Sequence, residues 1–300
     1  RRPLSRAPGI RAEDVFLAQG TLRPDLIESA SAMVSTNAAV IKTHHNDTQL
    51  VRRLRDEGRI IEPLADYHKD EVRALGAELG LPEHLVWRQP FPGPGLAIRV
   101  LCADAPYVTP DHASVAAALQ SACAGAACGL PVSAHLLPCR TVGVQGDGRS
   151  YSYLAGLSLA GAPDAHWEAL FAVAKAIPGT VHQVNRIVFL LGEPVDVAPS
   201  TITPTRLTPD VLAQLRAADH IVTQALVKYG LLRSLSQCPV TLFPVDFGIS
   251  GARSIGIRAF LTNDFMTGTP AMPGRELPIA CIREIHSRIL AEVPGVARRS

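Results

Sequence analysis

Three short apolar runs mark the first ninety residues, at positions 15–18, 40–41 and 60–64. Each run ends at a polar or turn-forming segment, as a buried strand does where it leaves a sheet. We therefore predict three strands in this part of the chain.

Amphipathic stretches separate these runs and predict helices. Residues 48–57 form a basic amphipathic segment, and a second helix is expected to begin within 66–71, with acidic residues in its first turn. Gly80 and Pro82 are expected to stop it. The apolar residues of its expected buried face are Val72, Leu75, Leu79 and Leu81. Strands that alternate with helices favour an α/β fold with a parallel sheet.

The second half of the chain contains an internal repeat. Residues 140–145 (RTVGVQ) resemble residues 253–258 (RSIGIR), and amphipathic helices are expected after them at 167–177 and 279–290. Each helix is expected to end in a Pro-Gly pair, the first at 178–179. Two related α+β units are the natural interpretation, and they leave the protein a monomer or a homodimer through these units.

Two further stretches predict elements in this half. Residues 113–127 are rich in alanine and cysteine, which predicts a helix with little packing specificity. Residues 185–191 form a run typical of a strand, which completes the first repeated unit.

A proline- and glycine-rich stretch, residues 88–99 (RQPFPGPGLAIR), separates the two halves. Its prolines fix the backbone and its glycines permit unusual conformations, so we expect a stiff loop. Arg88 and Arg99 flank glycine N–H groups, which suits a phosphate site, whereas an ordinary connector between domains is the other interpretation. The expected domains are 1–87, 88–200 and 201–300.

Composition excludes several classes of protein. Of the 300 residues 47% are apolar and the net charge is +2, so no extended surface for nucleic acid or an acidic membrane is expected. No apolar run approaches a membrane span. The six cysteines form no C-x-x-C pair, which favours free thiols in the cytosol. The basic N-terminus lacks the apolar region of a secretory signal and an initiating Met, so we expect a fragment.

Two polar clusters follow the first two predicted strands. Asp25 and Glu28 share one helix face, either as a site at the carboxyl edge of the sheet or as a solvated acidic first turn. Lys42, His44 and His45 suit a clamp on a polyphosphate that neutralises charge as pyrophosphate leaves. A polar loop without a role is the alternative, and a metal site is disfavoured because adjacent side chains on an extended chain point opposite ways.

A third polar cluster interrupts the first repeat. Arg149 offers a planar fork for phosphate, and Asp147 can accept from a ribose hydroxyl or a base N–H. An ion pair on the surface of a hairpin is the alternative. Residues 259–262 carry no charge at the same place in the second repeat, so ligand chemistry is expected in the first copy alone.

An ordered set of motifs resembles the family of glutamine-hydrolysing GMP synthetases. In family order they are FLAQGT (16–21), PDLIES (24–29), IKTHHN (41–46), KDEVR (69–73), the loop 90–95, TVGVQGD with RSY (141–151) and TNDFMTG (262–268). Each motif alone is weak, but the ordered set is specific and spans residues from about 13 to 296. The twin C-terminal units resemble the longer, eukaryotic-style form.

The resemblance implies a partial parallel-sheet ATP-pyrophosphatase domain followed by two related α+β units. It also implies ATP-dependent amination of xanthosine monophosphate (XMP) to GMP through an adenyl-XMP intermediate, with ammonia from glutamine. Mg²⁺ is expected to accompany the ATP, with no metal site built by the protein. No nucleic-acid or membrane partner is expected.

The resemblance further implies roles for individual residues. Those near the reacting purine or in a lid over ATP are Asp25, Glu28, Lys42, His44 and His45. Those at a helix start that couples the two half-sites are Lys69, Asp70 and Glu71. Those that contact XMP are Pro92, Gly93, Gly95, Asp147, Arg149 and Gln237.

The chain also departs from the family pattern. The phosphate loop (Ser-Gly-Gly-x-Asp-Ser), the glutaminase domain and the final tail that closes on XMP have no counterpart in these 300 residues. A non-catalytic chain or assembly module of the family is therefore the alternative. Another adenylating enzyme, such as a relative of NAD synthetase, fits the chemistry but does not explain the repeated units.

Overall fold

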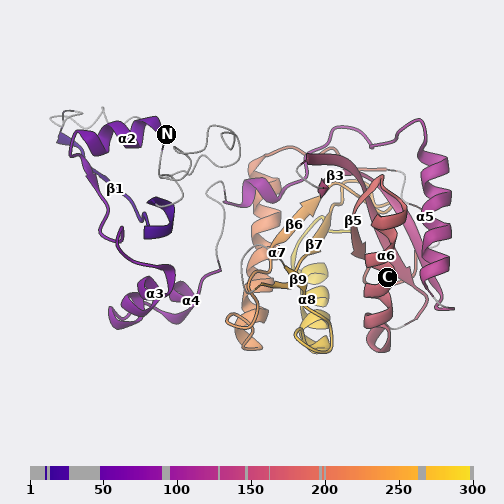
Figure 1. The fold of residues 1–300 in the computed structure, drawn as a ribbon. Coiled ribbons are helices and arrows are strands. Elements are labelled where there is room, and N and C mark those ends of the chain that lie inside the picture. Colours follow the sequence, from indigo (N-terminus) through magenta and orange to yellow (C-terminus); the bar gives the residue numbers. More distant parts are fainter. Residues whose placement is uncertain are drawn as a thin grey trace. The chain divides into compact units, whose positions relative to one another are not determined.

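Two compact units make up the chain, residues 1–88 and residues 89–300 (Figure 1). The computed structural model describes residues 11, 14–26, 48–89, 95–127, 129–145, 148–161, 163–195, 198, 201–262 and 268–297.

The N-terminal unit contains a two-stranded parallel sheet. Strand β1 (Leu17–Ala18) pairs with β2 (Ile60–Ile61). Two predicted strands and their parallel pairing are thus confirmed, although both are shorter than the apolar runs that predicted them. The third, at residues 40–41, lies outside the described residues.

Among the described residues, this sheet is accompanied by the helices α2 (Gln49–Asp56), α3 (Lys69–Glu78) and α4 (Glu83–Val86). The Thr48 hydroxyl accepts the Val51 N–H and caps the start of α2. Gly80 adopts a φ of +77° directly beyond α3, so the predicted stop is confirmed.

The predicted buried face of α3 is partly wrong. Leu79 is 73% exposed and Leu81 is 50% exposed, while Gly76 is the buried residue of the helix. Among the described residues, α3 packs chiefly on the four-residue α4, which is too short to cover a whole helix face.

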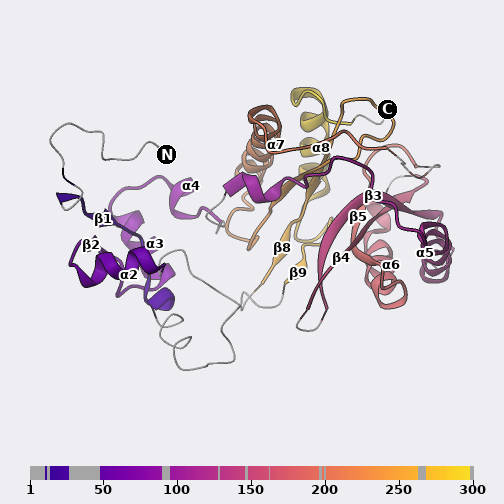
Figure 2. The ribbon, with the colours of Figure 1, turned by 90° about the horizontal axis from the view of Figure 1, so that it is seen from above.

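A three-stranded sheet organises the first part of the C-terminal unit. The long hairpin of β3 (Val132–Gln145) and β4 (Gly148–Leu159) is antiparallel, and β5 (Val184–Phe189) runs parallel to β4. Helices α5 (His112–Ala126) and α6 (Trp167–Thr180) lie side by side on one face of this sheet (Figure 2).

Two details of these helices differ from expectation. Helix α5 buries Val115, Leu119 and Cys123 in the core beneath the sheet, so its packing is specific. Helix α6 continues through Pro178, where the sequence predicts its end. Proline removes one helical N–H donor, but the fully buried Ile177 holds the last turn against the core.

The second part of the unit has two smaller sheets. Its elements are α7 (Pro209–Lys228), β6 (Val240–Phe243), β7 (Ser254–Ile257), β8 (Phe260–Leu261), β9 (Thr269–Pro270) and α8 (Ile279–Glu292). β6 pairs with β7, and β8 pairs with β9, both antiparallel. The strand and the helix predicted for each copy of the repeat are present. The domain boundary at residue 200 stays a prediction.

The two sheets β3–β4–β5 and β6–β7 meet through a shared apolar cluster. Leu137, Cys139 and Leu154 of the first contact Phe243 and Val245 of the second part. Separate cores lie on the helix side of each sheet. The two sheets therefore face each other within one unit.

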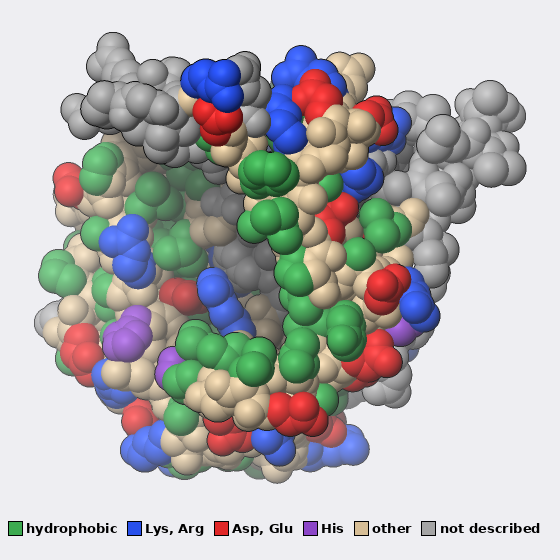
Figure 3. Space-filling view, turned by 90° about the vertical axis from the view of Figure 1, so that its left-hand side faces the viewer, with side chains coloured by type: hydrophobic (Ala, Val, Ile, Leu, Met, Phe, Trp, Pro, Cys, Tyr) green, Lys and Arg blue, Asp and Glu red, His purple; other side chains and the backbone are tan. Residues whose placement is uncertain are grey.

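The surface carries both signs of charge. Figure 3 shows basic and acidic side chains interspersed over one face, in line with the net charge of +2. Among the described residues, no helix combines the length and apolar character needed to cross a membrane.

Candidate functional site

Three polar side chains meet where β1 and β2 end. The buried Thr21 hydroxyl donates to Glu62 Oε1 at 2.6 Å, and Arg55 donates to both Glu62 oxygens at 2.9 and 3.0 Å. Parallel sheets place ligands beyond the carboxyl ends of their strands. No sequence pattern predicted this group, although Thr21 follows the first predicted strand closely and Glu62 lies within the third.

Asp25 lies near the same strand end, in a helical turn formed by residues 23–26. Its carboxylate Oδ2 accepts the Leu22 N–H at 3.0 Å, and the residue is half-buried. The other predicted residues of this half lie outside the described residues: Glu28, Lys42, His44 and His45. Their grouping with Asp25 stays a prediction.

The start of α3 separates the three predicted coupling residues. Glu71 Oε2 accepts the His68 N–H at 2.6 Å, which closes the first turn of the helix. Asp70 is fully exposed, with its carboxylate 3.7 Å from Arg73. Lys69 is half-buried, and burial first and the neighbouring Arg73 second lower the pKa of its ammonium. Of the three, Lys69 is the one half-buried residue.

Gln89 anchors the beginning of the proline-glycine stretch. Its amide Nε2 donates to the Leu235 carbonyl at 3.1 Å, and its Oε1 accepts the Cys238 N–H at 2.8 Å. Gln237 is thereby held next to this stretch. Two predicted residues of the stretch lie outside the described residues: Pro92 and Gly93.

The end of the same stretch is also fixed. Gly95 takes a φ of +67° and begins a 3₁₀ helix, Gly95–Arg99. Arg99 donates to Asp219 Oδ1 at 2.9 Å, so its charge is matched within the protein. Burial lowers the pKa of the Arg99 guanidinium. Arg99 is therefore less suited to flank a phosphate than the sequence alone predicts.

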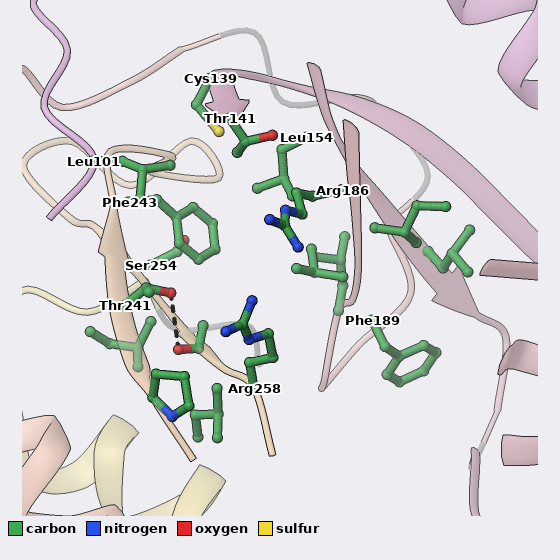
Figure 4. Close-up of a pocket in the computed structure, with 18 of the residues that line it drawn as sticks. Leu101, Cys139, Thr141, Leu154, Arg186, Phe189, Thr241, Phe243, Ser254 and Arg258 are labelled. Atoms are coloured by element: carbon green, nitrogen blue, oxygen red, sulfur yellow. Dashed lines mark hydrogen bonds between the residues drawn. The ribbon is translucent and has the colours of Figure 1, made fainter. Parts of the chain in front are cut away.

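A cleft of about 1740 Å³ lies between the two facing sheets (Figure 4). Residues labelled around it are Leu101, Cys139, Thr141, Leu154, Arg186, Phe189, Thr241, Phe243, Ser254 and Arg258. Gln237 also lines it, whereas Gly95 and the exposed Arg149 do not, and Asp147 lies outside the described residues. The structure thus brings one predicted XMP contact into the cleft. The cleft forms only because two sheets pack face to face, and no local sequence pattern predicts that packing.

The apolar wall of this cleft includes a neutral thiol. Cys139 is 2% exposed, and burial raises its pKa to about 12. In the part of the chain that the structure describes, no group of three or more His, Cys, Asp or Glu side chains could hold a metal ion.

Comparison with known proteins identifies relatives over nearly the whole chain. A Dictyostelium discoideum protein named GMP synthase [glutamine-hydrolyzing] is 50% identical over 329 residues, covering 97% of this chain and 45% of that protein. A Caenorhabditis elegans protein named probable GMP synthase [glutamine-hydrolyzing] is 41% identical over 350 residues, covering 96% and 47%. No protein-family model matches the chain.

Bacterial relatives align with a smaller part. The GMP synthase [glutamine-hydrolyzing] of Phenylobacterium zucineum is 44% identical over 192 residues, covering 58% of this chain and 35% of that protein. The chain spans about half the length of the eukaryotic relatives it matches. By its sequence, the chain belongs to the family of glutamine-hydrolysing GMP synthases.

Proposed function

We propose that this chain supplies the synthetase part of a GMP synthase, a carbon–nitrogen ligase that uses glutamine as amide donor. The reaction is ATP-dependent amination of XMP to GMP through an adenyl-XMP intermediate. The observation that carries the proposal is the 50% and 41% identity over 97% and 96% of the chain. In this proposal residues 1–87 are part of an ATP-pyrophosphatase domain, residues 88–300 are two related α+β units, and the protein is cytosolic.

The N-terminal unit would handle ATP and the reacting purine. Asp25 and Glu28 would act near the purine, and the segment with Lys42, His44 and His45 would close over ATP. Closure keeps water from an activated adenylate, and the cationic groups stabilise the departing pyrophosphate. The carboxyl edge of β1 and β2, where Asp25 follows the first strand, supports this placement.

The start of α3 would couple the two half-reactions. Lys69 is the best supported of the three residues, because its ammonium is half-buried and burial lowers its pKa. Asp70 and Glu71 would act beside it, with Glu71 also capping the helix.

The C-terminal unit would hold XMP. Pro92, Gly93 and Gly95 would contact it from the loop, whose start is anchored through Gln89. Three further contacts are proposed: Asp147, Arg149 and Gln237. Gln237 has the strongest support, because it lines the cleft directly beside the segment that Gln89 holds.

Magnesium is proposed only as the companion of ATP. Mg²⁺ on the phosphates of ATP would neutralise negative charge during pyrophosphate release.

The test is an assay, with ATP, XMP and ammonium, of a full-length enzyme that contains these 300 residues. We expect pyrophosphate release that depends on XMP, followed by GMP formation. Lys42→Ala and His45→Ala should each lower pyrophosphate release by about a hundredfold or more, as loss of one transition-state donor does. Release that is unchanged in both variants would remove the lid assignment.

A non-catalytic chain is the second candidate, because the chain covers 45% and 47% of its eukaryotic relatives. Calorimetric titration separates the two candidates. XMP binding without ATP binding and without turnover would indicate a non-catalytic assembly module that retains only an XMP site. Binding of both nucleotides with GMP formation would exclude that interpretation.

A further inference from the structure

Two arginines from opposite sheets point toward each other across the cleft. Arg186 lies on β5, and Arg258 follows β7, so each repeated unit contributes one guanidinium (Figure 4). Neither belongs to the residues assigned above to XMP, ATP or the coupling of the half-sites.

A β-bulge aims Arg186 into the cleft. Tyr153 pairs with Val184 and the next residue, Leu154, pairs with Arg186, so Asn185 is an extra residue in β5. Val184 packs in the core beneath the helices, and side chains two positions apart on a regular strand share a face. Without the bulge, the arginine would therefore point into that core.

Further hydrogen bonds fix this arrangement. Asn185 Nδ2 donates to the Thr141 carbonyl at 3.0 Å, and Asn185 Oδ1 accepts the Ser150 hydroxyl at 3.0 Å. Arg186 Nε donates to the Val142 carbonyl at 3.1 Å. One edge of the guanidinium is thus held by backbone, which leaves its Nη groups directed at the cleft.

Arg258 is held on the other wall. Its backbone N–H donates to the Pro239 carbonyl at 3.1 Å, and its guanidinium carbon lies 4.9 Å from the centre of the Phe260 ring. Burial first and the positive charge of Arg186 second lower the pKa of this guanidinium. The two side chains are both exposed to solvent, and their like charges face each other across the cleft.

No carboxylate of the described residues forms an ion pair with either arginine, and positive charge prevails around the cleft. Its basic lining residues are Arg99, Arg140, Lys175, Arg186 and Arg258, and its acidic ones are Asp104 and Glu168. Both acidic residues lie within ion-pair distance of other arginines, Asp104 of Arg206 at 2.7 Å and Glu168 of Arg275 at 3.8 Å. Like charges on opposite walls of a cleft repel each other, and an anion between them relieves that repulsion.

We propose that Arg186 and Arg258 together bind the phosphate group of a nucleoside monophosphate in the cleft between the twin sheets. Guanidinium forks match phosphate oxygens in geometry and form charge-assisted hydrogen bonds. Because each repeated unit supplies one arginine, the site forms only when the two units pack against each other.

The size and lining of the cleft favour a nucleotide over a bare anion. At about 1740 Å³ it exceeds the space of a phosphate group many times. Leu101, Leu154 and Phe243 give it apolar walls that suit a flat base. The choice of a nucleotide rests on the proposed function, whereas the phosphate site follows from the arginines alone.

Calorimetric titration of the whole chain tests the site, with inorganic phosphate, GMP and guanosine as probes. We expect GMP and phosphate to bind and guanosine to bind more weakly. Arg186→Gln and Arg258→Gln should each weaken phosphate and GMP binding about tenfold or more, since each removes a charge-assisted contact. Arg258→Lys keeps the positive charge but lacks the planar guanidinium fork. Its affinity for phosphate and GMP should therefore lie between that of the unmodified chain and that of Arg258→Gln.

Arg216→Gln is the matched control, because Arg216 is exposed on α7 and does not line the cleft. Its phosphate and GMP affinity should equal that of the unmodified chain. In phosphate-free buffer, Arg258→Gln should unfold at the same temperature or higher, because it relieves repulsion from Arg186. Equal affinity in Arg186→Gln, Arg258→Gln and Arg216→Gln, or no phosphate binding at all, would overturn the inference.

The outcomes also separate this inference from the proposed function. GMP binding that survives both cleft variants but is lost in Arg149→Gln would overturn the arginine site and leave the proposed XMP contacts standing. Phosphate and GMP binding through the arginine pair, without any ATP-dependent amination of XMP by the full-length enzyme, would support the arginine site and count against the proposed function. If one variant does not fold, the other arginine's variant and Arg258→Lys decide the result.

Discussion

Glu71 holds the first turn of α3 through the backbone of His68. The carboxylate accepts an N–H that has no partner within the helix, and it lies where the helix dipole favours negative charge. Asp70, its neighbour, is exposed and makes no comparable backbone bond among the described contacts. The loss of stability on removing either side chain therefore depends on the hydrogen bonds that the side chain makes.

Replacing Glu71 with alanine should therefore destabilise the start of α3 by about 1 kcal/mol, the typical value of a lost cap. Hydrogen exchange of the α3 amides measures this as about fivefold faster local opening. Glu71→Gln keeps an acceptor oxygen and should largely restore protection, and Asp70→Ala should change it less than Glu71→Ala. Equal effects of the two alanine variants would contradict the capping role.

The buried thiol of Cys139 makes stability depend on alkaline pH. Burial raises its pKa from 9.0 to about 12, so the folded state holds this proton more tightly than the unfolded state. Its contribution to the free energy of unfolding is complete below pH 9 and is lost as pH rises toward 12. The stability difference between the unmodified chain and Cys139→Ala should stay constant to pH 9 and then shrink.

Denaturant unfolding at intervals between pH 7 and pH 11 measures this difference. Cys102→Ala is the control, because Cys102 is exposed and its replacement removes no buried thiol. A difference for Cys139→Ala that stays flat above pH 10 would show that the thiol is not shielded from solvent.

At the scale of elements, the contact of Asn185 on β5 with β3, across the central strand β4, depends on the absence of a side chain at Gly143. A Cβ at Gly143 would lie 2.6 Å from Asn185 Oδ1 and 2.9 Å from the Ser150 hydroxyl. Asn185 is the extra residue of the bulge in β5, so this close approach permits the bulge that turns Arg186 toward the cleft.

Gly143→Ala should consequently destabilise the chain by about 1–3 kcal/mol, as overpacking does. It should also weaken phosphate binding, because Asn185 must move and Arg186 follows it. Gly125→Ala is the control, since a Cβ there meets nothing within 4 Å and α5 gains up to about 1 kcal/mol of helix propensity. Thermal unfolding and phosphate titration measure both effects, and unchanged stability in Gly143→Ala would refute the close packing.

Local patterns predict the elements of this chain better than their ends or their neighbours. Helical spacing locates α2, α6 and α8 because a 3.6-residue period depends only on nearby residues. Pro178 misleads because buried Ile177 keeps the helix going. The exposure of Leu79 and the orientation of Arg186 depend on tertiary packing and on a one-residue bulge, which sequence spacing does not encode.

At the scale of the whole molecule, the two units differ in how much apolar surface they bury. Val51 is the one buried hydrophobic residue among the described residues of 1–88, whereas all the others lie within 89–300. Each fully buried aliphatic side chain contributes about 1.5–3 kcal/mol relative to exposure. The described part of the N-terminal unit therefore has far less hydrophobic stabilisation, and Leu79 remains exposed on it.

This imbalance predicts that the N-terminal unit opens at much lower free energy than the C-terminal unit. Hydrogen–deuterium exchange should show fast exchange in β1, β2 and α3 under conditions in which β4 and α7 stay protected. Limited proteolysis should remove the N-terminal unit first and leave a resistant product beginning near Gln89. Protection of β1 and β2 equal to that of β4 would mean that the described residues of 1–88 are stabilised by something other than their own core.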